Sequence, residues 1–219
     1  MRNYSARFRN NAASRQFLTG AMPTRRRMLA MAALSAAAAF CPAAGFPLNA
    51  DEAREHVQKM LAAFKDVGLS QISDDEFIAE FEEALGKFGD VQIIARAALG
   101  KSWRIASKSQ SREFTEIFQS YLARKYGRIL RKYASREIAI KSSRKFKRLY
   151  EVNSTARSAS NRPINIRWMV SDSSGEAKLV DIILEGVSML GAERSEIQAM
   201  LSKRSGDIDT LINDLKARL

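Results

Sequence analysis

Residues 114–130, FTEIFQSYLARKYGRIL, contain the pattern around which the rest of the chain is organised. Apolar side chains recur here at spacings of three and four, which places them on one face of a helix with 3.6 residues per turn. They are Phe114, Ile117, Phe118, Tyr121, Leu122, Tyr126, Ile129 and Leu130. The pattern predicts a central amphipathic helix that packs by this face.

The opposite face of the predicted helix is basic towards its C-terminal end, where the helix dipole favours positive charge. The basic side chains are Arg124, Lys125, Arg128, Arg131 and Lys132. The apolar face carries more large aromatic rings than an ordinary core helix needs. This excess suggests a pocket for an apolar guest, and the alternative is a helix packed on a sheet with no guest.

Downstream of this helix the periodicity changes to that of strands. Four runs rich in β-branched and aromatic residues are separated by Ser, Asn, Pro and Gly turns, at residues 137–141, 145–156, 163–171 and 177–185. In the third run one face carries Ile164, Ile166, Trp168 and Val170, and in the fourth Val180, Ile182 and Leu184. The runs predict an antiparallel sheet of about four strands.

Further helices are predicted before and after these segments. One begins at Asp51 and stops at Gly68, a capping box at Ser73 opens a second, and a third ends at Gly100. Ser109 or Ser111 can cap the central helix. The fold class is therefore α+β. We expect one domain over residues 46–219, helical over 51–130, with the sheet over 136–186 and C-terminal helices over 193–219.

The first 45 residues predict an export signal. Arg25, Arg26 and Arg27 precede an uncharged run of 13 residues, 28–40, and small residues follow it. The run is shorter than the roughly 20 residues that span a bilayer as a helix. The arginine pair and the Ala-rich core resemble a twin-arginine signal, and a start at Met22 would make that signal compact. Cleavage between Ala44 and Ala50 would leave the mature chain without its only cysteine.

The charge is concentrated in the middle of the chain. The formal net charge is +12, but the first 45 residues contribute seven arginines and no acid. Residues 96–167 hold 19 basic and four acidic side chains, so this part attracts nucleic acid, anionic lipid headgroups or an acidic protein surface. An exported protein meets membranes rather than nucleic acid. We therefore expect peripheral membrane contact and no nucleic-acid partner.

No constellation of catalytic residues is recognisable. The sequence has no Walker loop, GxGxxG, GxSxG, HExxH or paired cysteines. His56 is the only histidine, and we interpret it as a solvated helix residue. Asp181 and Glu185 would lie about 13 Å apart on one strand face, which is too wide for a hydrolytic carboxylate pair. The expectation is a protein without catalytic activity, metal site or cofactor.

Four segments, taken in order, resemble the MlaC, or toluene-tolerance, family. They are residues 118–126 (FQSYLARKY), the tryptophan strand 163–170, residues 181–188 (DIILEGVS) and residues 206–212 (GDIDTLI). The family pattern combines F-x-x-Y-L with a basic-aromatic helix, D-x-x-x-E-G-V-S and a closing Gly-x-Ile-Asp-x-Leu-Ile. The D-x-x-x-E-G-V-S element is the most specific of these. The likeness covers about residues 61–219.

The resemblance implies a periplasmic phospholipid carrier of the ABC-type system that maintains outer-membrane lipid asymmetry. In such carriers a curved antiparallel sheet and helices enclose the acyl chains. The implied partners are a phospholipid, an inner-membrane ABC transporter complex and an outer-membrane lipoprotein complex, with the carrier acting as a monomer. A hopanoid carrier of the same family and an exported adaptor with a dry core are the alternatives.

The candidate wall of the lipid cavity is chosen on geometry rather than on the family motifs. It combines the apolar faces of the central helix and of the last two strands. The candidates are Phe114, Phe118, Tyr121, Leu122, Trp168, Val170, Ile182 and Leu184.

Overall fold

The central helix exists and is longer than the apolar pattern that predicted it. Helix α5 runs from Lys108 to Arg131. It is capped by Ser107 and not by Ser109 or Ser111: the Ser107 hydroxyl accepts from the backbone N–H of Gln110 at 3.1 Å, and the Gln110 side chain accepts from the Ser107 N–H at 3.0 Å. This reciprocal pair satisfies two donors at the helix start, and it places the first turn upstream of both predicted caps.

A computed structural model of the protein describes residues 48–131, 136–157 and 161–219, all of which fall in one unit spanning Gly45–Leu219. The predicted export signal, residues 1–45, lies outside the described residues. Within the described ranges no helix combines the length and the apolar character needed to cross a membrane.

Two helices precede α5 with the caps that their sequences favour. Helix α2 (Ala50–Leu69) is capped by Asn49 and runs through Gly68, so the predicted stop is one residue early. Helix α3 (Asp74–Phe88) begins with the capping box predicted at Ser73. Gly127 of α5 faces α3, and a Cβ added there would lie 3.2 Å from Ile78 Cγ1. The glycine therefore permits the two helices to approach closely.

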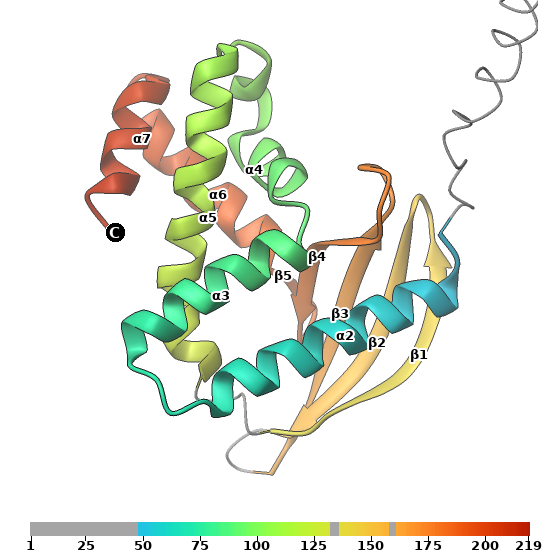
Figure 1. Ribbon diagram of the computed structural model, residues 1–219. Coiled ribbons are helices and arrows are strands. Elements are labelled where there is room, and N and C mark those ends of the chain that lie inside the picture. The colour runs from blue at the N-terminus through green and yellow to red at the C-terminus, as the bar shows by residue number, and fades with distance from the viewer. Residues whose placement is uncertain (1–47, 132–135, 158–160) are drawn as a thin grey trace, which may run out of the picture. The chain divides into compact units, whose positions relative to one another are not determined.

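A cluster of helices surrounds the N-terminal two thirds of α5 (Figure 1). It contains α4 (Val91–Leu99), α6 (Met189–Ser202) and α7 (Ile208–Lys216), while the short 3-10 helix η1 (Gly100–Arg104) follows α4. The rings of Phe114 and Phe118 stack in this cluster with centroids 5.2 Å apart, and Phe118 and Tyr121 lie 6.1 Å apart. The aromatic stripe of α5 is thus used for packing among helices.

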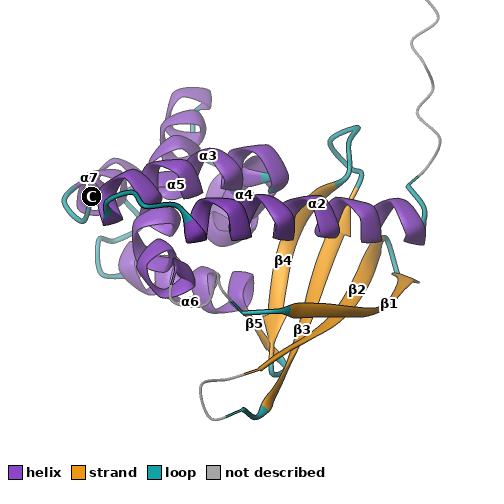
Figure 2. Ribbon diagram, turned by 60° about the horizontal axis from the view of Figure 1, so that its bottom comes forward, coloured by secondary structure: helices purple, strands orange, loops and turns teal. Residues whose placement is uncertain are grey.

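The strands form one antiparallel sheet in sequence order, which confirms the α+β fold class. They are β1 (Ile138–Phe146), β2 (Leu149–Arg157), β3 (Pro163–Ser171), β4 (Lys178–Leu184) and a short β5 (Val187–Ser188). Figure 2 shows α2 lying across one face of this sheet. We call that face, which bears Val152, Ile166, Trp168 and Val170, the inner face.

Two details of the predicted sheet are wrong. The first turn was expected between residues 141 and 145, but β1 continues through them, and its residues 142–144 pair with residues 151–153 of β2. The Arg144 guanidinium also reaches Glu151 across the strand pair, at 2.8 Å. The turn is instead at Lys147 and Arg148. In β4 the register shifts, so that Leu179 and not Val180 lies opposite Val170 and joins the inner-face cluster.

Candidate functional site

The inner face of the sheet carries apolar side chains that the protein covers only in part. Strand residues Ile138, Ile140, Ile164 and Ile182 and the α2 residues Leu61 and Phe64 are partly exposed at the edge of the cluster that contains Val152 and Trp168. The helical cluster around α5 also has partly exposed apolar side chains at its edge, among them Ile117 and Trp103, while Phe114 and Phe118 at its centre have no exposed surface. Apolar area without protein cover is the feature expected of a surface that binds an apolar ligand.

Trp168 lies near the centre of the inner face. Its indole N–H donates to the Ser154 hydroxyl on β2 at 2.8 Å, and that hydroxyl lies 3.4 Å from the Ile166 carbonyl. The single polar atom of the ring is therefore satisfied within the sheet. What the ring presents to the rest of the inner face is purely apolar.

Three phenylalanine rings from α2 and α3 lie where the sheet cluster meets a second, smaller cluster. Phe64 belongs to the edge of two clusters, the inner face and a smaller one formed by α3 and α5. Its ring centroid lies 5.3 Å from that of Phe81 and 6.5 Å from that of Phe88. Phe64 therefore bridges the two clusters, and together with the sheet it bounds the candidate apolar site between α2, α3 and the strands.

His56 differs from its prediction as a solvated residue. It is partly buried on α2, where its Nε2 lies 3.0 Å from the Phe88 carbonyl and its ring meets Phe88 edge-on at 5.7 Å. Burial lowers the pKa of the imidazole, and the Lys178 and Lys59 charges act in the same direction against the opposing hydrogen bond. The neutral ring with its proton on Nε2 donates to the Phe88 carbonyl and ties α2 to α3.

An open pocket of about 300 Å³ lies beside His56, between the start of α2 and the β3–β4 loop. Its carboxylates are already engaged: Glu55 with Lys59 at 2.7 Å, Glu176 with Lys178 at 3.2 Å, and Asp172 with the Leu48 N–H at 3.2 Å. Among the described residues no group of three or more His, Cys, Asp or Glu side chains is arranged to hold a metal ion. The pocket is lined mostly by charged side chains, and it adjoins the inner-face cluster through Leu48 and Ala177.

The predicted wall residues fall into two separate groups. Phe114, Phe118, Tyr121 and Leu122 are in the helical cluster, whereas Trp168, Val170 and Ile182 are on the inner face. Leu184, at the end of β4, is 40% exposed and belongs to neither cluster. The structure therefore does not bring the two predicted halves of the wall together.

The predicted wall left out residues of two elements that contribute to the inner face, β1 and α2. Ile138 and Ile140 alternate in the first predicted strand, and Phe64 continues the apolar period of the first predicted helix. The alternation and the period were the signals that could have identified them. Neither signal says which face of the sheet a helix covers.

Part of the basic face of α5 is neutralised inside the protein. Lys125 donates to Glu193 at 2.7 Å and to Glu196 at 2.6 Å. The hydroxyl of Tyr121 donates to Glu196, and that of Tyr126 donates to Glu193. Burial tends to lower the pKa of Lys125, but the hydrogen bonds to both carboxylates outweigh it and the pKa is raised. The cluster joins α5 to α6.

Residues 181–188, which carry the most specific family pattern, stabilise the local structure through hydrogen bonds. Asp181 accepts from the Ser188 hydroxyl at 2.6 Å and from the Leu190 N–H at 2.9 Å, while Ser188 caps α6. Glu185 sits in the β4–β5 turn with φ 48° and accepts from the Asn165 N–H. The two acids therefore act as hydrogen-bond acceptors that anchor the chain around the β4–β5 turn.

Comparisons with known proteins agree with this fold. The family model described as MlaC protein matches residues 54–217. Among solved structures, the chain is similar to the phospholipid-binding protein from Ralstonia solanacearum in complex with a phospholipid, with 21% identity, 78% of this chain and 96% of that chain covered, and a TM-score of 0.64. At this identity the likeness shows the fold. Since the family model matches more than half of the chain, the protein belongs to the MlaC family.

Proposed function

We propose that the protein is a periplasmic phospholipid carrier that holds the acyl chains of its ligand against the inner face of the sheet. The observation that carries the proposal is the row of partly exposed apolar side chains on that face, among them Ile140, Ile164 and Ile182. Membership of the MlaC family and the phospholipid bound by the Ralstonia solanacearum protein support it.

The binding energy in this proposal comes from the acyl chains. Burying a methylene group contributes about 0.8 kcal/mol, so two chains that are covered over part of their length supply on the order of 10 kcal/mol. No headgroup-specific contact is required. The ligand is carried and not altered, which agrees with a family of binding and transport proteins.

The proposal extends to transport between membranes. Export by the twin-arginine pathway would place the protein in the periplasm. A monomer would then receive lipid from one membrane complex and deliver it to another. The partners in this scheme are an inner-membrane ABC transporter complex and an outer-membrane lipoprotein complex.

Of the predicted wall residues, we assign Ile182 to direct contact with lipid, with Leu184 at the margin. Trp168 and Val170 lie on the same face but are 6% and 0% exposed, so they would reach the lipid only if the cover of the sheet moved. Leu61, Phe64, Ile138 and Ile140 are added to the wall from the structure. For the four candidates on α5 the wall assignment stays a prediction. They would reach the lipid only if the helical cluster opened.

Native mass spectrometry of the purified protein tests the proposal. The wild-type protein should carry a phospholipid, and Ile182→Asp should lose most of it, because a carboxylate on the inner face disfavours an acyl chain. Ile183→Asp is the matched control, since Ile183 is adjacent on β4, is also partly exposed and points to the other face. It should retain lipid.

Four outcomes would count against parts of the proposal. A consistently empty wild-type protein contradicts lipid carriage, and a hopanoid in place of the phospholipid supports the alternative carrier. Equal loss in both variants contradicts the inner-face site. Loss of lipid in a folded Leu122→Gln variant would indicate that α5 also contacts the lipid.

A further inference from the structure

The β1–β2 hairpin concentrates positive charge at one end of the sheet. Residues 141–148 contain five basic side chains, and no acid lies between Glu137 and Glu151. All five are exposed. We call residues 144–149, where β1 turns into β2, the hairpin tip.

Little of this charge is compensated within the protein. Arg144 pairs with Glu151 at 2.8 Å, but this buried carboxylate is shared with Arg167, at 3.1 Å. The side chains of Lys145 and Arg148 form no hydrogen bond or ion pair with any described residue. The hairpin tip therefore projects a positive field into solvent.

An aromatic ring is exposed among these cations. Phe146 is 36% exposed and lies opposite Leu149 in the strand pair. The Arg144 guanidinium is 5.8 Å and the Lys147 ammonium 5.6 Å from the centroid of the Phe146 ring. Apolar side chains ringed by cations are the composition of surfaces that enter the headgroup layer of an anionic membrane.

The turn itself retains a cation in an unfavourable conformation. Lys147 has φ 57°, in the left-handed region. Two-residue hairpin turns favour Gly, Asn or Asp at such positions, because side chains with a Cβ rarely adopt them. A lysine here departs from the local preference, and such departures are expected at functional or strained sites.

Protection of an edge strand explains only part of this pattern. β1 is at the edge of the sheet, and charged side chains on an edge discourage pairing with another chain. Charged side chains on β1 are enough to discourage pairing with another chain, so edge protection explains neither the exposed Phe146 nor the lysine in the turn. We propose that the hairpin tip docks the protein on anionic phospholipid bilayers, with its cations on the headgroups and Phe146 within the headgroup layer.

The hairpin tip is connected to the proposed lipid site through β1, whose other end supplies Ile138 and Ile140 to the inner face. Contact through the tip would bring the edge of the lipid-binding sheet to the bilayer. The inference does not require the proposed function: bilayer docking and lipid occupancy are separate properties with separate measurements.

Co-sedimentation with vesicles tests the docking surface. The probes are vesicles of phosphatidylcholine alone and of phosphatidylcholine with 30% phosphatidylglycerol, at low and high salt. The triple variant Lys145→Gln/Lys147→Gln/Arg148→Gln should bind the anionic vesicles about 100-fold more weakly than wild type, since each cation near such a surface contributes about fivefold. Phe146→Ser should lower the affinity about fivefold and leave the salt dependence unchanged.

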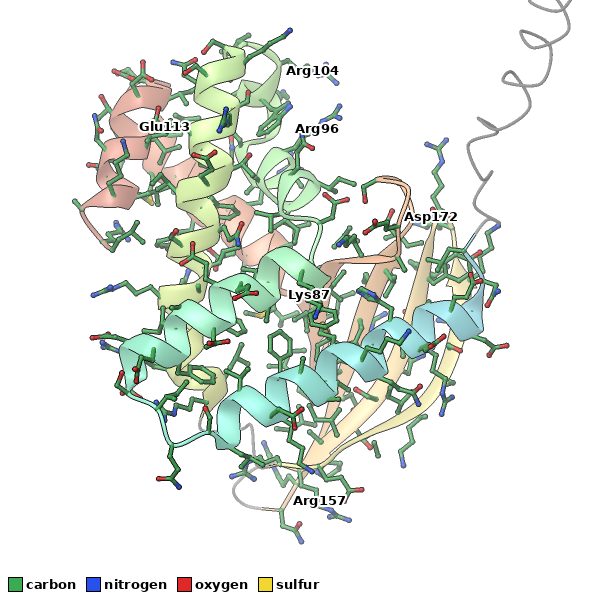
Figure 3. The ribbon with its side chains drawn as sticks, in the orientation of Figure 1. Lys87, Arg96, Arg104, Glu113, Arg157 and Asp172 are labelled. Atoms are coloured by element: carbon green, nitrogen blue, oxygen red, sulfur yellow. The ribbon has the colours of Figure 1, made fainter. Side chains whose placement is uncertain are left out.

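A second basic segment provides the matched control. Lys101, Arg104 and Lys108 lie on or beside η1, also without an ion pair to any described residue, and Figure 3 shows Arg104 well away from β1. The variant Lys101→Gln/Arg104→Gln/Lys108→Gln removes the same charge and should lose less than threefold. Equal losses in the two triple variants, or wild-type binding by the hairpin variant, would overturn the inference. Native mass spectra should show the hairpin variant still loaded with lipid.

Discussion

The indole N–H of Trp168 on β3 donates a hydrogen bond to the hydroxyl of Ser154 on β2, with 2.8 Å between the two atoms. Both residues are almost fully buried, at 6% and 3% exposure. The bond lets a large aromatic ring lie on the inner face without an unsatisfied donor. The Ser154 hydroxyl thus satisfies the polar group of Trp168, and the proposed lipid surface stays apolar.

Removing the acceptor should destabilise the protein. In Ser154→Ala the buried indole N–H loses its partner, and the free energy of unfolding should fall by about 1–3 kcal/mol. Urea denaturation followed by circular dichroism measures the change. Ser142→Ala is the control, because that hydroxyl accepts a bond from Asn153 in an exposed position, and its effect should stay within about 0.5 kcal/mol. Equal losses of unfolding free energy in the two variants would mean that the Trp168–Ser154 hydrogen bond stabilises the protein no more than an exposed one.

Lys125 and Glu193 should behave as a coupled pair. The Glu193 side chain is 4% exposed, so Lys125→Met leaves a buried carboxylate without its cation and should lower the free energy of unfolding by about 3 kcal/mol. The double variant Lys125→Met/Glu193→Leu should recover most of that loss. Thermal and urea unfolding of the four members of the cycle give the coupling energy.

An exposed ion pair serves as the comparison for this cycle. Lys59 and Glu55 are also 2.7 Å apart, but both side chains are more than half exposed. Lys59→Met should leave stability unchanged within error. Additive effects of the Lys125 and Glu193 substitutions would refute the coupling.

The stability of the protein should depend on His56 between neutral and mildly acidic pH. Burial lowers the pKa of His56 in the folded state, so between the folded-state pKa and about 6.5 the unfolded chain binds more protons. The contribution of the neutral ring is fully present above about pH 6.5 and is lost as the pH falls towards the folded-state pKa.

Urea unfolding of the wild type and of His56→Gln at intervals from pH 5 to 8 isolates this contribution, because the chain has one histidine. The wild type should lose stability relative to the variant as the pH falls below 6.5. Parallel curves for the two proteins would show that His56 titrates alike in both states.

Tryptophan fluorescence should report on the inner face. The chain has two tryptophans, and Trp168 lies on the inner face whereas Trp103 packs at the edge of the helical cluster. In Trp103→Phe, removal of bound lipid should shift the emission of Trp168 to longer wavelength, because the partly exposed part of the inner face beside the ring becomes hydrated. In Trp168→Phe the remaining Trp103 emission should not move. A shift confined to Trp103 would place the ligand on the helical side.

Local patterns in the sequence predicted most of the elements. The Ser73 capping box and the apolar period of residues 114–130 act within a few residues of one another, and both helices formed where expected. The first hairpin turn was misplaced because Ser142 is a common turn residue and Arg144 is neither β-branched nor aromatic. Only their cross-strand partners, Asn153 and Glu151, show that they belong to β1.

The sequence by itself determined the α+β fold class, the helical stripe of α5 and the alternation that gives the sheet its apolar face, since these depend on the period of 3.6 or 2 along the chain. Only the tertiary structure decided what each stripe packs against. The rings of α5 are enclosed by α4, α6 and α7, whereas α2 covers the sheet. The physical reason is that burial depends on contacts between distant segments, and periodicity identifies a face but not its partner.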